Sequence, residues 1–183
     1  MTENKCDECG QVFASKELLM EHAKMHMGKA KVGFGAGKTI ISSVIGGIIG
    51  GILMLLVLMA GAAGIMGMGL GAPMGSAVMV GVLGHFTVSI VAGAIFGAIV
   101  SYVKPLRLKN GVKSLGLGVA FAIVLYLVFF LPMAMAVFAP VMMNMMGAKA
   151  AMMLPDVLVI GFAGHVLYGL VLGPIAVGIG GKL

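Results

Sequence analysis

Four long apolar segments constrain this chain more than any other feature of its sequence. They lie at residues 39–62, 78–102, 114–138 and 156–180. Each reaches the roughly 20 residues that an α-helix needs to cross the hydrocarbon of a bilayer. Only 10% of the 183 residues are charged, against about 25% in a soluble domain, so the chain could not cover a globular surface in water. We therefore expect an all-α membrane protein in which residues 39–183 form a four-helix transmembrane bundle.

Positive charge between the segments predicts the orientation of the chain. The connection between the second and third segments carries Lys104, Arg107, Lys109 and Lys113, whereas the other two connections carry only Lys149. Loops rich in Lys and Arg stay on the cytoplasmic side of a membrane. The sequence thus predicts a multi-pass protein of the cell membrane with its N- and C-termini in the cytoplasm.

The two halves of the apolar region are similar to each other. Residues 81–93 read GVLGHFTVSIVAG and residues 161–173 read GFAGHVLYGLVLG, with three glycines and one histidine at matching positions. Each half, about 39–105 and 113–183, would then be one helical hairpin, and an axis along the membrane normal would relate the two. The bundle is therefore predicted to consist of two repeated hairpins.

The polar N-terminus carries a metal-binding pattern. Two residues separate Cys6 from Cys9, and His22 and His26 are four apart on one face of a predicted helix. Two thiolates and two imidazoles complete a tetrahedral Zn²⁺ site. Both cysteines are used in this way, which suits a reducing compartment. We expect residues 1–28 to form a cytosolic zinc-binding domain, followed by a Gly/Lys hinge over residues 29–38.

These ligands, with Phe13 and Leu19 between them, are similar to the Cys-Cys-His-His zinc finger family over about residues 4–27. The resemblance implies a β-hairpin packed on a helix, a ββα fold, with zinc as its cofactor. Ser15 would cap a helix that begins at Lys16, and bound metal would supply the stability that so small an apolar core lacks. In layout, the chain resembles small archaeal membrane proteins that carry one such finger before their spans, which implies no particular activity.

Many members of the family read DNA, but this finger lacks the residues for it. The positions that contact bases in the family fall on Ser15, Leu18 and Glu21, and none of these is an Arg or Asn. One finger alone also rarely offers enough interface for specific DNA binding. Nucleic acid is therefore a disfavoured partner, and we expect the finger to bind a cytosolic protein.

His85 and His165 occupy matching positions of the repeat, about 10–13 Å below the predicted outer surface at 1.5 Å per helical residue. Ionisable groups at such depth are costly and usually face a partner or a cavity. The pair could share a metal ion such as copper, ligate haem or relay a proton. Each ring could equally be a structural hydrogen-bonding group, and the sequence leaves these alternatives open.

Methionines gather after the first and third apolar segments, and the second group includes Met142, Met143, Met145 and Met146. Thioethers are soft ligands that select Cu(I), so these residues and the two histidines could bind or move copper. The alternative is that flexible methionine side chains fill gaps in a glycine-rich bundle. Composition alone does not separate the two.

The chemistry of the sequence favours a binding protein over an enzyme. Asp156 is the one carboxylate beyond residue 21, and no nucleophile–base or acid–base pair is evident. We favour a non-enzymatic adaptor or regulatory protein. Copper binding or transport through the bundle is the alternative, and a membrane-tethered DNA-binding regulator is the least favoured function. The lipid bilayer is a certain neighbour of such a chain, and a homo-oligomer is compatible with it.

Overall fold

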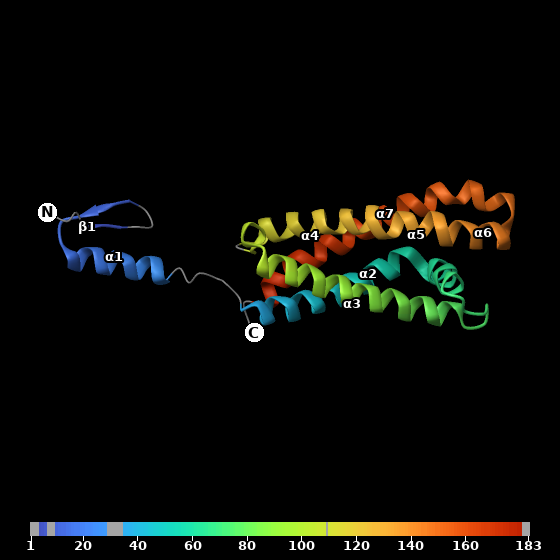
Figure 1. Ribbon diagram of the computed structural model, residues 1–183, viewed down its shortest axis with the longest axis horizontal. Coiled ribbons are helices and arrows are strands. Elements are labelled where there is room, and N and C mark those ends of the chain that lie inside the picture. The colour runs from blue at the N-terminus through green and yellow to red at the C-terminus, as the bar shows by residue number, and fades with distance from the viewer. Residues whose placement is uncertain (1–3, 7–9, 29–34, 109, 181–183) are drawn as a thin grey trace. The chain divides into compact units, whose positions relative to one another are not determined.

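The computed structural model describes residues 4–6, 10–28, 35–108 and 110–180, apart from the side chains of residues 23–28 and 58–61. The chain divides into two compact units, Met1–Gly33 and Phe34–Leu183. The first contains a short hairpin and one helix, and the second is a bundle of long helices (Figure 1).

The hairpin of the first unit pairs β1 (Asn4–Lys5) antiparallel with β2 (Val12–Phe13). Between the strands, the Gly10 N–H donates to the Cys6 carbonyl at 2.8 Å. Gly10 has a φ of 76°, a conformation that glycine adopts without steric cost. The hairpin is thus closed beside Cys6 by a turn that requires glycine.

The helix of the first unit is α1 (Lys16–Gly28). The Leu18 N–H donates to the Ser15 hydroxyl at 3.3 Å, which satisfies one of the free N–H groups at the helix start. The predicted N-cap and the predicted first residue of this helix are confirmed. Both strands contact α1.

Four helical segments of the second unit are long and apolar enough to cross a membrane. They are α2 (Ala36–Gly69), α3 (Ala77–Tyr102), a third segment over Gly111–Met146, and α7 (Ala148–Gly180), with a 3₁₀ turn, η1 (Lys104–Leu106), before the third. The third segment is a series of helical pieces: α4 (Gly111–Leu125), η2 (Tyr126–Phe130), α5 (Leu131–Met133), η3 (Ala134–Phe138) and α6 (Ala139–Met146). The chain is a multi-span membrane protein, as its apolar segments predicted.

The third segment continues as a helix through two prolines. Pro132 and Pro140 lack the N–H that would bond the carbonyl four residues back, and a proline ring clashes with that carbonyl in a regular α-helix. The carbonyls concerned belong to residues within η2 and η3, which are wide π-helical turns. A wider turn moves the carbonyl away from the ring. Each proline is therefore accommodated by the π-helical turn before it.

The structure corrects several predicted boundaries. The third helix does not end near residue 138 but runs to Met146, and Gly147, at φ 59°, is the single residue between it and α7, which begins at Ala148 and not at residue 156. The predicted outer connection between the last two spans is thus almost entirely helical. The first long helix, α2, differs at both ends, because it runs to Gly69 and not to residue 62, and because the last residues of the predicted hinge, Ala36–Lys38, belong to it. Residues 29–34 of the hinge lie outside the described residues.

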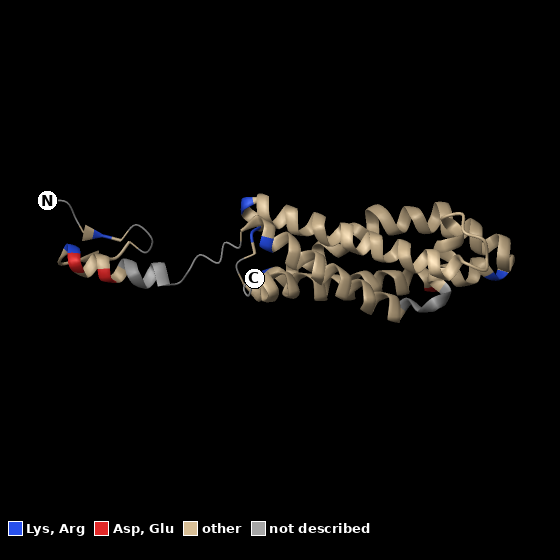
Figure 2. Cartoon of the chain, turned by 90° about the horizontal axis from the view of Figure 1, so that it is seen from below, with Lys and Arg blue, Asp and Glu red and all other residues tan. Residues whose placement is uncertain are grey.

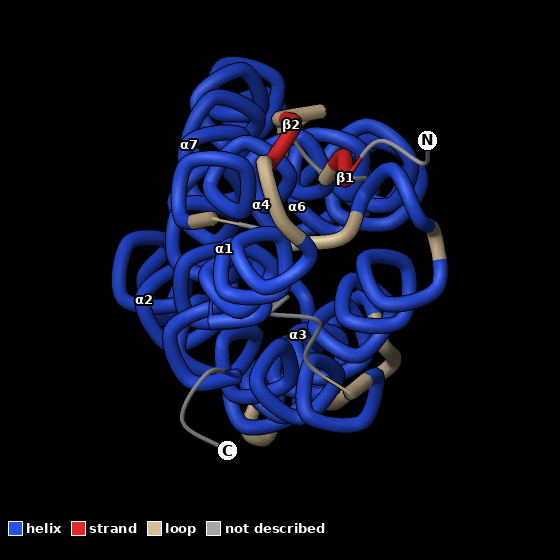
Figure 3. The backbone as a smooth tube through the Cα atoms, turned by 90° about the vertical axis from the view of Figure 1, so that its left-hand side faces the viewer, coloured by secondary structure: helices blue, strands red, loops and turns tan. Residues whose placement is uncertain are grey.

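The helices of the second unit run side by side, as the end-on view shows (Figure 3). α2 packs against both α3 and α7, and α7 packs against α4. The Ser42 hydroxyl of α2 donates to the Ala176 carbonyl of α7 at 2.8 Å. α3 reaches the third segment through the ring pair Phe96 and Phe121, whose centroids lie 5.3 Å apart. Helix α2 thus lies between α3 and α7, α7 lies between α2 and α4, and the Phe96–Phe121 contact brings α3 and the third segment together to close the bundle.

Glycines allow equivalent close contacts within each of the two hairpins. In the first hairpin, a Cβ built on Gly93 of α3 would lie 2.6 Å from the Ser43 carbonyl of α2. In the second, a Cβ on Gly173 of α7 would clash with the Ser114 carbonyl of α4. Gly93 and Gly173 match in the sequence repeat, and small residues let membrane helices approach closely. A crowded contact between helices therefore occurs at this pair of repeat-related positions.

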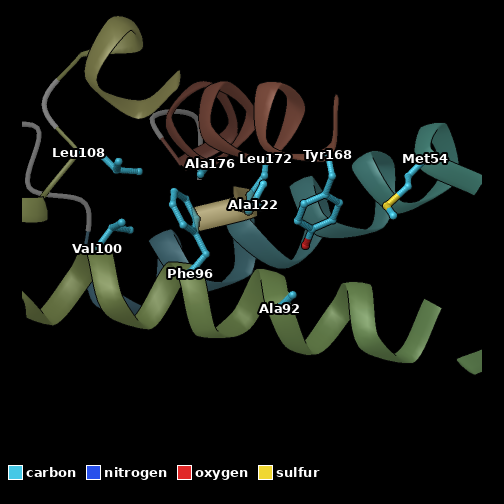
Figure 4. Packing of buried hydrophobic residues seen from close by; sticks show 9 residues of the cluster. All are labelled: Met54, Ala92, Phe96, Val100, Leu108, Ala122, Tyr168, Leu172 and Ala176. Carbon is cyan, nitrogen blue, oxygen red and sulfur yellow. The ribbon is translucent and has the colours of Figure 1, made fainter. Parts of the chain in front are cut away.

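The buried centre of the bundle is small and made largely of residues from α3 and α7. Tyr168, Leu172 and Ala176 line one face of α7 toward Phe96 of α3 (Figure 4). Much of the remaining apolar surface is exposed, including Leu56, Val112 and Val159. In a soluble protein such exposure would be costly, whereas hydrocarbon covers it in a bilayer.

The described Lys and Arg residues of the second unit lie near the ends of its helices, whereas Asp156 lies within α7 (Figure 2). Lys38 lies in the first turn of α2, Lys104 in η1 and Lys113 in the first turn of α4. The Lys113 ammonium donates to the Pro105 carbonyl at 2.7 Å. Lys149 lies beside the turn at Gly147, at the opposite end of the third segment. The apolar bodies of the helices thus separate a basic end from an end that is poor in charge.

Candidate functional site

The described part of the predicted zinc site consists of Cys6 and His22. Cys6 follows β1 directly and is buried, with 5% of its surface exposed. The His22 ring of α1 packs against Phe13 of β2, with ring centroids 4.5 Å apart. Hairpin and helix therefore each contribute one predicted ligand to the same small unit, and Phe13 provides part of the apolar core that the motif predicted.

The other two predicted ligands cannot be placed. Cys9 lies outside the described residues, and His26 belongs to α1 but its side chain is not described. Among the side chains that the structure describes, no three of His, Cys, Asp and Glu gather into a metal-binding group. The complete zinc site, which needs all four ligands, remains a prediction.

The outer surface of α1 combines apolar and acidic side chains. Leu18 and Met20 are each about half exposed, and Glu17 and Glu21 are exposed as well. Of the predicted base-contact positions, Ser15 accepts the capping hydrogen bond from Leu18. The surface therefore offers no cation to a phosphate backbone at these positions.

His85 of α3 is half-buried against α2. Its Nε2 lies 3.0 Å from the Gly51 carbonyl, and because a carbonyl only accepts, this nitrogen carries the proton. A Cβ on Gly51 would lie 2.8 Å from the Ser89 Cβ and 3.8 Å from His85 Nε2. Glycine at position 51 thus makes room for the part of α3 that holds this ring.

His165 of α7 is also half-buried, but it bonds within its own helix. Its Nδ1 lies 2.7 Å from the Gly161 carbonyl, one turn earlier, so here Nδ1 is the protonated nitrogen. Two aromatic rings of the third segment surround it, with the Phe130 centroid at 5.0 Å and the Tyr126 centroid at 5.5 Å. The two histidines therefore match in sequence but use different nitrogens and different kinds of partner.

The structure brings His85 and His165 to one cavity of about 350 Å³. The cavity is lined from four sides, by α2, α3, the third segment and α7, and most of its lining is apolar. Its other polar side chains are Thr87, Ser89 and Tyr168. A concave, mostly apolar site with a few polar groups is typical of small-molecule binding.

The hydroxyls in this cavity are all used as donors to backbone carbonyls. Thr87 donates to Leu83 at 2.9 Å, Ser89 to His85 at 2.8 Å, and Tyr168 to Ser89 at 3.0 Å. In contrast, neither histidine has a hydrogen bond at its second nitrogen, Nδ1 of His85 or Nε2 of His165, among the residues that the structure describes. These two nitrogens are the groups of the cavity best placed to bind something else.

The predicted methionine ligands lie elsewhere. Met142, Met143, Met145 and Met146 belong to α6, where Met142 is buried and the other three are exposed, and none of them lines the cavity. The methionines that do line it are Met54, Met66 and Met133. The structure thus places the predicted methionine cluster apart from the histidine pair.

Sequence analysis did not single out the aromatic residues around His165. Of the three tyrosines, Tyr126 and Tyr168 lie inside predicted spans, whereas Tyr102 is the last residue of one. A buried tyrosine hydroxyl needs a hydrogen-bond partner, and Tyr126 donates to the Leu158 carbonyl of α7 at 3.1 Å. A tyrosine inside an apolar segment could therefore have predicted a hydrogen bond between helices at these positions.

No model of a known protein family, no curated protein and no solved structure matches this chain. The class that the fold defines is a four-span membrane protein with a small hairpin–helix unit at its N-terminus.

Proposed function

We propose that this protein is a non-enzymatic membrane adaptor whose N-terminal unit binds Zn²⁺ through Cys6, Cys9, His22 and His26 and contacts a cytosolic protein. The observation that carries the proposal is the arrangement of the first unit. A buried cysteine follows one strand, and a histidine of the helix packs on an aromatic residue of the other strand.

The size of the unit supports a structural metal. Residues 4–28 contain two strands of two residues and one helix, far below the roughly 40 residues at which an apolar core begins to stabilise a fold alone. A structural zinc ion binds such a peptide with about 10–16 kcal/mol and thereby folds it. The four ligands have the thiolate and imidazole chemistry that Zn²⁺ prefers.

The surface of α1 supports a protein partner over a nucleic acid. Leu18 and Met20 expose about half of their surface, which suits burial against an apolar patch. Glu17 and Glu21 on the same helix would repel phosphates and would favour a partner with basic residues around that patch.

The charges of the second unit support a cytoplasmic location for this surface. Lys38, Lys104 and Lys113 belong to the starts of α2 and α4 and to the turn between α3 and α4, all at one end of the bundle. By the positive-inside rule this end faces the cytoplasm, and residue 36, where α2 begins, lies there too. The proposed adaptor therefore has its zinc-binding unit in the compartment that keeps thiols reduced.

The decisive experiment uses the full-length protein purified in detergent. We expect one zinc per chain by elemental analysis, and we expect a chelator to unfold residues 4–28 while the bundle keeps its helices, as followed by residue-resolved hydrogen exchange. Cys9→Ser should lose the metal and the protection of this segment. Glu21→Gln, which changes an exposed neighbour of His22 on α1, should retain both. Wild-type protein with no bound zinc, or with exchange protection that a chelator leaves unchanged, would refute the proposal.

A further inference from the structure

We propose that the cavity shared by His85 and His165 binds a lipid-soluble ring compound with hydroxyl donors, of the hydroquinone class. The inference rests on two histidine nitrogens that have no hydrogen bond to the described residues and that lie in one apolar cavity. It does not depend on the zinc-binding unit.

Hydrogen bonding defines what the two rings can offer. Nε2 of His85 and Nδ1 of His165 each donate to a backbone carbonyl, at 3.0 Å and 2.7 Å. Burying an imidazolium in apolar surroundings costs far more than burying a neutral ring, so each second nitrogen carries a lone pair. The hydroxyls of Thr87, Ser89 and Tyr168 already donate elsewhere. The cavity therefore presents two acceptors, which suit a ligand with two O–H groups.

The size of the cavity selects a ring over a bare metal ion. Its volume is about 350 Å³, within the range of roughly 300–1,000 Å³ found for small-molecule sites. A coordinated metal ion is surrounded closely by its ligands at about 2.0–2.3 Å and would leave most of this space empty. A six-membered ring with substituents would fill it.

The walls of the cavity are suited to a flat ring. Phe129, Phe130 and Phe138 of the third segment line it together with the tyrosine of α7. Phe130 also packs on His165, with centroids 5.0 Å apart. Aromatic side chains form offset and edge-to-face contacts with a ligand ring and add to the apolar burial.

Access to the cavity is from the side of the bundle. Several lining residues are themselves exposed, and they come from α3 and the third segment: Val88, Val91, Ile95, Phe129 and Met133. These two segments are in contact at Phe96 and Phe121, whereas the lining residues just named leave apolar surface exposed. In a bilayer such surface faces acyl chains, so a ligand would enter from the lipid and could leave an apolar tail there.

The test measures equilibrium binding to the full-length protein in lipid nanodiscs under anaerobic conditions. The probes are a hydroquinone with a ten-carbon tail, its quinone and its dimethyl ether, which share the tail and the six-membered carbon skeleton; the ether also keeps the aromatic ring. We expect saturable binding of one hydroquinone per chain above the partition into protein-free nanodiscs. The quinone and the ether only accept hydrogen bonds, so each should bind about tenfold more weakly or worse, given roughly two- to tenfold for each lost hydrogen bond.

Variants locate the bound probe. His85→Phe and His165→Phe should each weaken hydroquinone binding about tenfold and reduce the preference for hydroquinone over its ether. Val91→Trp should block the opening without touching a histidine, because Val91 lines the cavity and is half exposed. Ile90→Trp is its matched control, since Ile90 is exposed on the same helix but does not line the cavity. Only variants with wild-type thermal stability in nanodiscs are compared.

Three outcomes would overturn the proposal. The first is equal binding of the hydroquinone, the quinone and the ether, which would mean apolar partitioning alone. The second is that Val91→Trp and Ile90→Trp weaken hydroquinone binding equally, or that neither of them weakens it. The third is stoichiometric Cu(I) bound by wild-type protein and lost in the His85→Phe/His165→Phe double variant, which would assign the cavity to a soft metal held with Met54, Met66 or Met133.

Discussion

The Tyr168 hydroxyl of α7 donates to the Ser89 carbonyl of α3 at 3.0 Å, and the Ser89 hydroxyl donates in turn to the His85 carbonyl at 2.8 Å. Tyr168 is buried, with 3% of its surface exposed. It connects the second hairpin to the first, and both Tyr168 and Ser89 line the shared cavity. The Tyr168 side chain therefore both joins the two hairpins and bonds to the part of α3 that carries His85.

We expect Tyr168→Phe to destabilise the bundle by about 0.5–1.5 kcal/mol, the net value of one hydrogen bond, because the Ser89 carbonyl loses a buried donor. Reversible unfolding in mixed micelles would measure the difference. Tyr102→Phe is the matched control, since Tyr102 has 71% of its surface exposed at the end of α3. Equal stability of the two variants would show that the hydrogen bond between the hairpins contributes nothing.

A second prediction concerns the glycines at the crowded helix contacts. Gly93→Ala would place a Cβ 2.6 Å from the Ser43 carbonyl oxygen. A backbone carbonyl cannot move aside as the end of a flexible side chain can. We expect this variant to lose about 1–3 kcal/mol, the usual cost of overpacking. Gly173→Ala, its counterpart in the repeat, should lose a similar amount through the Ser114 carbonyl.

Gly116→Ala provides the control for this pair. A Cβ on Gly116 of α4 meets nothing within 4 Å, so the change should be neutral or slightly stabilising, because alanine is the better helix former by up to about 1 kcal/mol. The same unfolding measurement applies. If the two crowded glycines tolerate alanine as well as Gly116 does, the close approach of the helices is not what stabilises the hairpins.

Most of the helical architecture could be predicted from hydropathy, because the bilayer leaves a chain few other choices. Backbone groups in hydrocarbon must bond within the chain, which makes each apolar segment of about 20 residues a helix. The same rule explains the incorrect boundary after residue 138. Proline usually ends a helix in water, whereas the third segment passes Pro132 and Pro140 through π-helical turns. Local helix propensity does not predict this continuation. The helix continues because ending it at a proline would leave backbone groups without hydrogen bonds in lipid.

The candidate site could be predicted only in part. The cost of ionisable groups in a membrane identified His85 and His165, and the structure brings both to one cavity. Sequence could not predict the cavity itself, because the π-helical turns before Pro132 and Pro140 change which side chains of the third segment face the other helices. The sequence also could not predict which ring nitrogen of each histidine donates a hydrogen bond. His85 donates to the Gly51 carbonyl of another helix, whereas His165 donates to the Gly161 carbonyl of its own helix.

The last prediction concerns the start of α1 in the proposed zinc-binding unit. Two hydrogen bonds, from the backbone N–H of Glu17 and from the Ser15 hydroxyl, hold the pKa of the exposed Glu17 carboxyl below its usual value. The ionised form is thus favoured by folding, so its contribution to stability is complete above the pKa of the unfolded chain and is lost as the pH falls through the lower, folded pKa. At neutral pH, Ser15 therefore both caps the helix and binds this carboxylate.

We expect Ser15→Ala to weaken zinc binding about fivefold at pH 7, because the loss of an N-cap costs about 1 kcal/mol and metal binding is coupled to folding. Competition with a chromophoric chelator would measure the affinity in the full-length protein. Ser15→Thr keeps the hydroxyl and should bind zinc almost as wild type does. Glu17→Gln should weaken binding in the wild-type background and less in the Ser15→Ala background, since the hydrogen bond that couples the two residues is then already absent. Strictly additive effects of the two substitutions would show that Ser15 and Glu17 act independently.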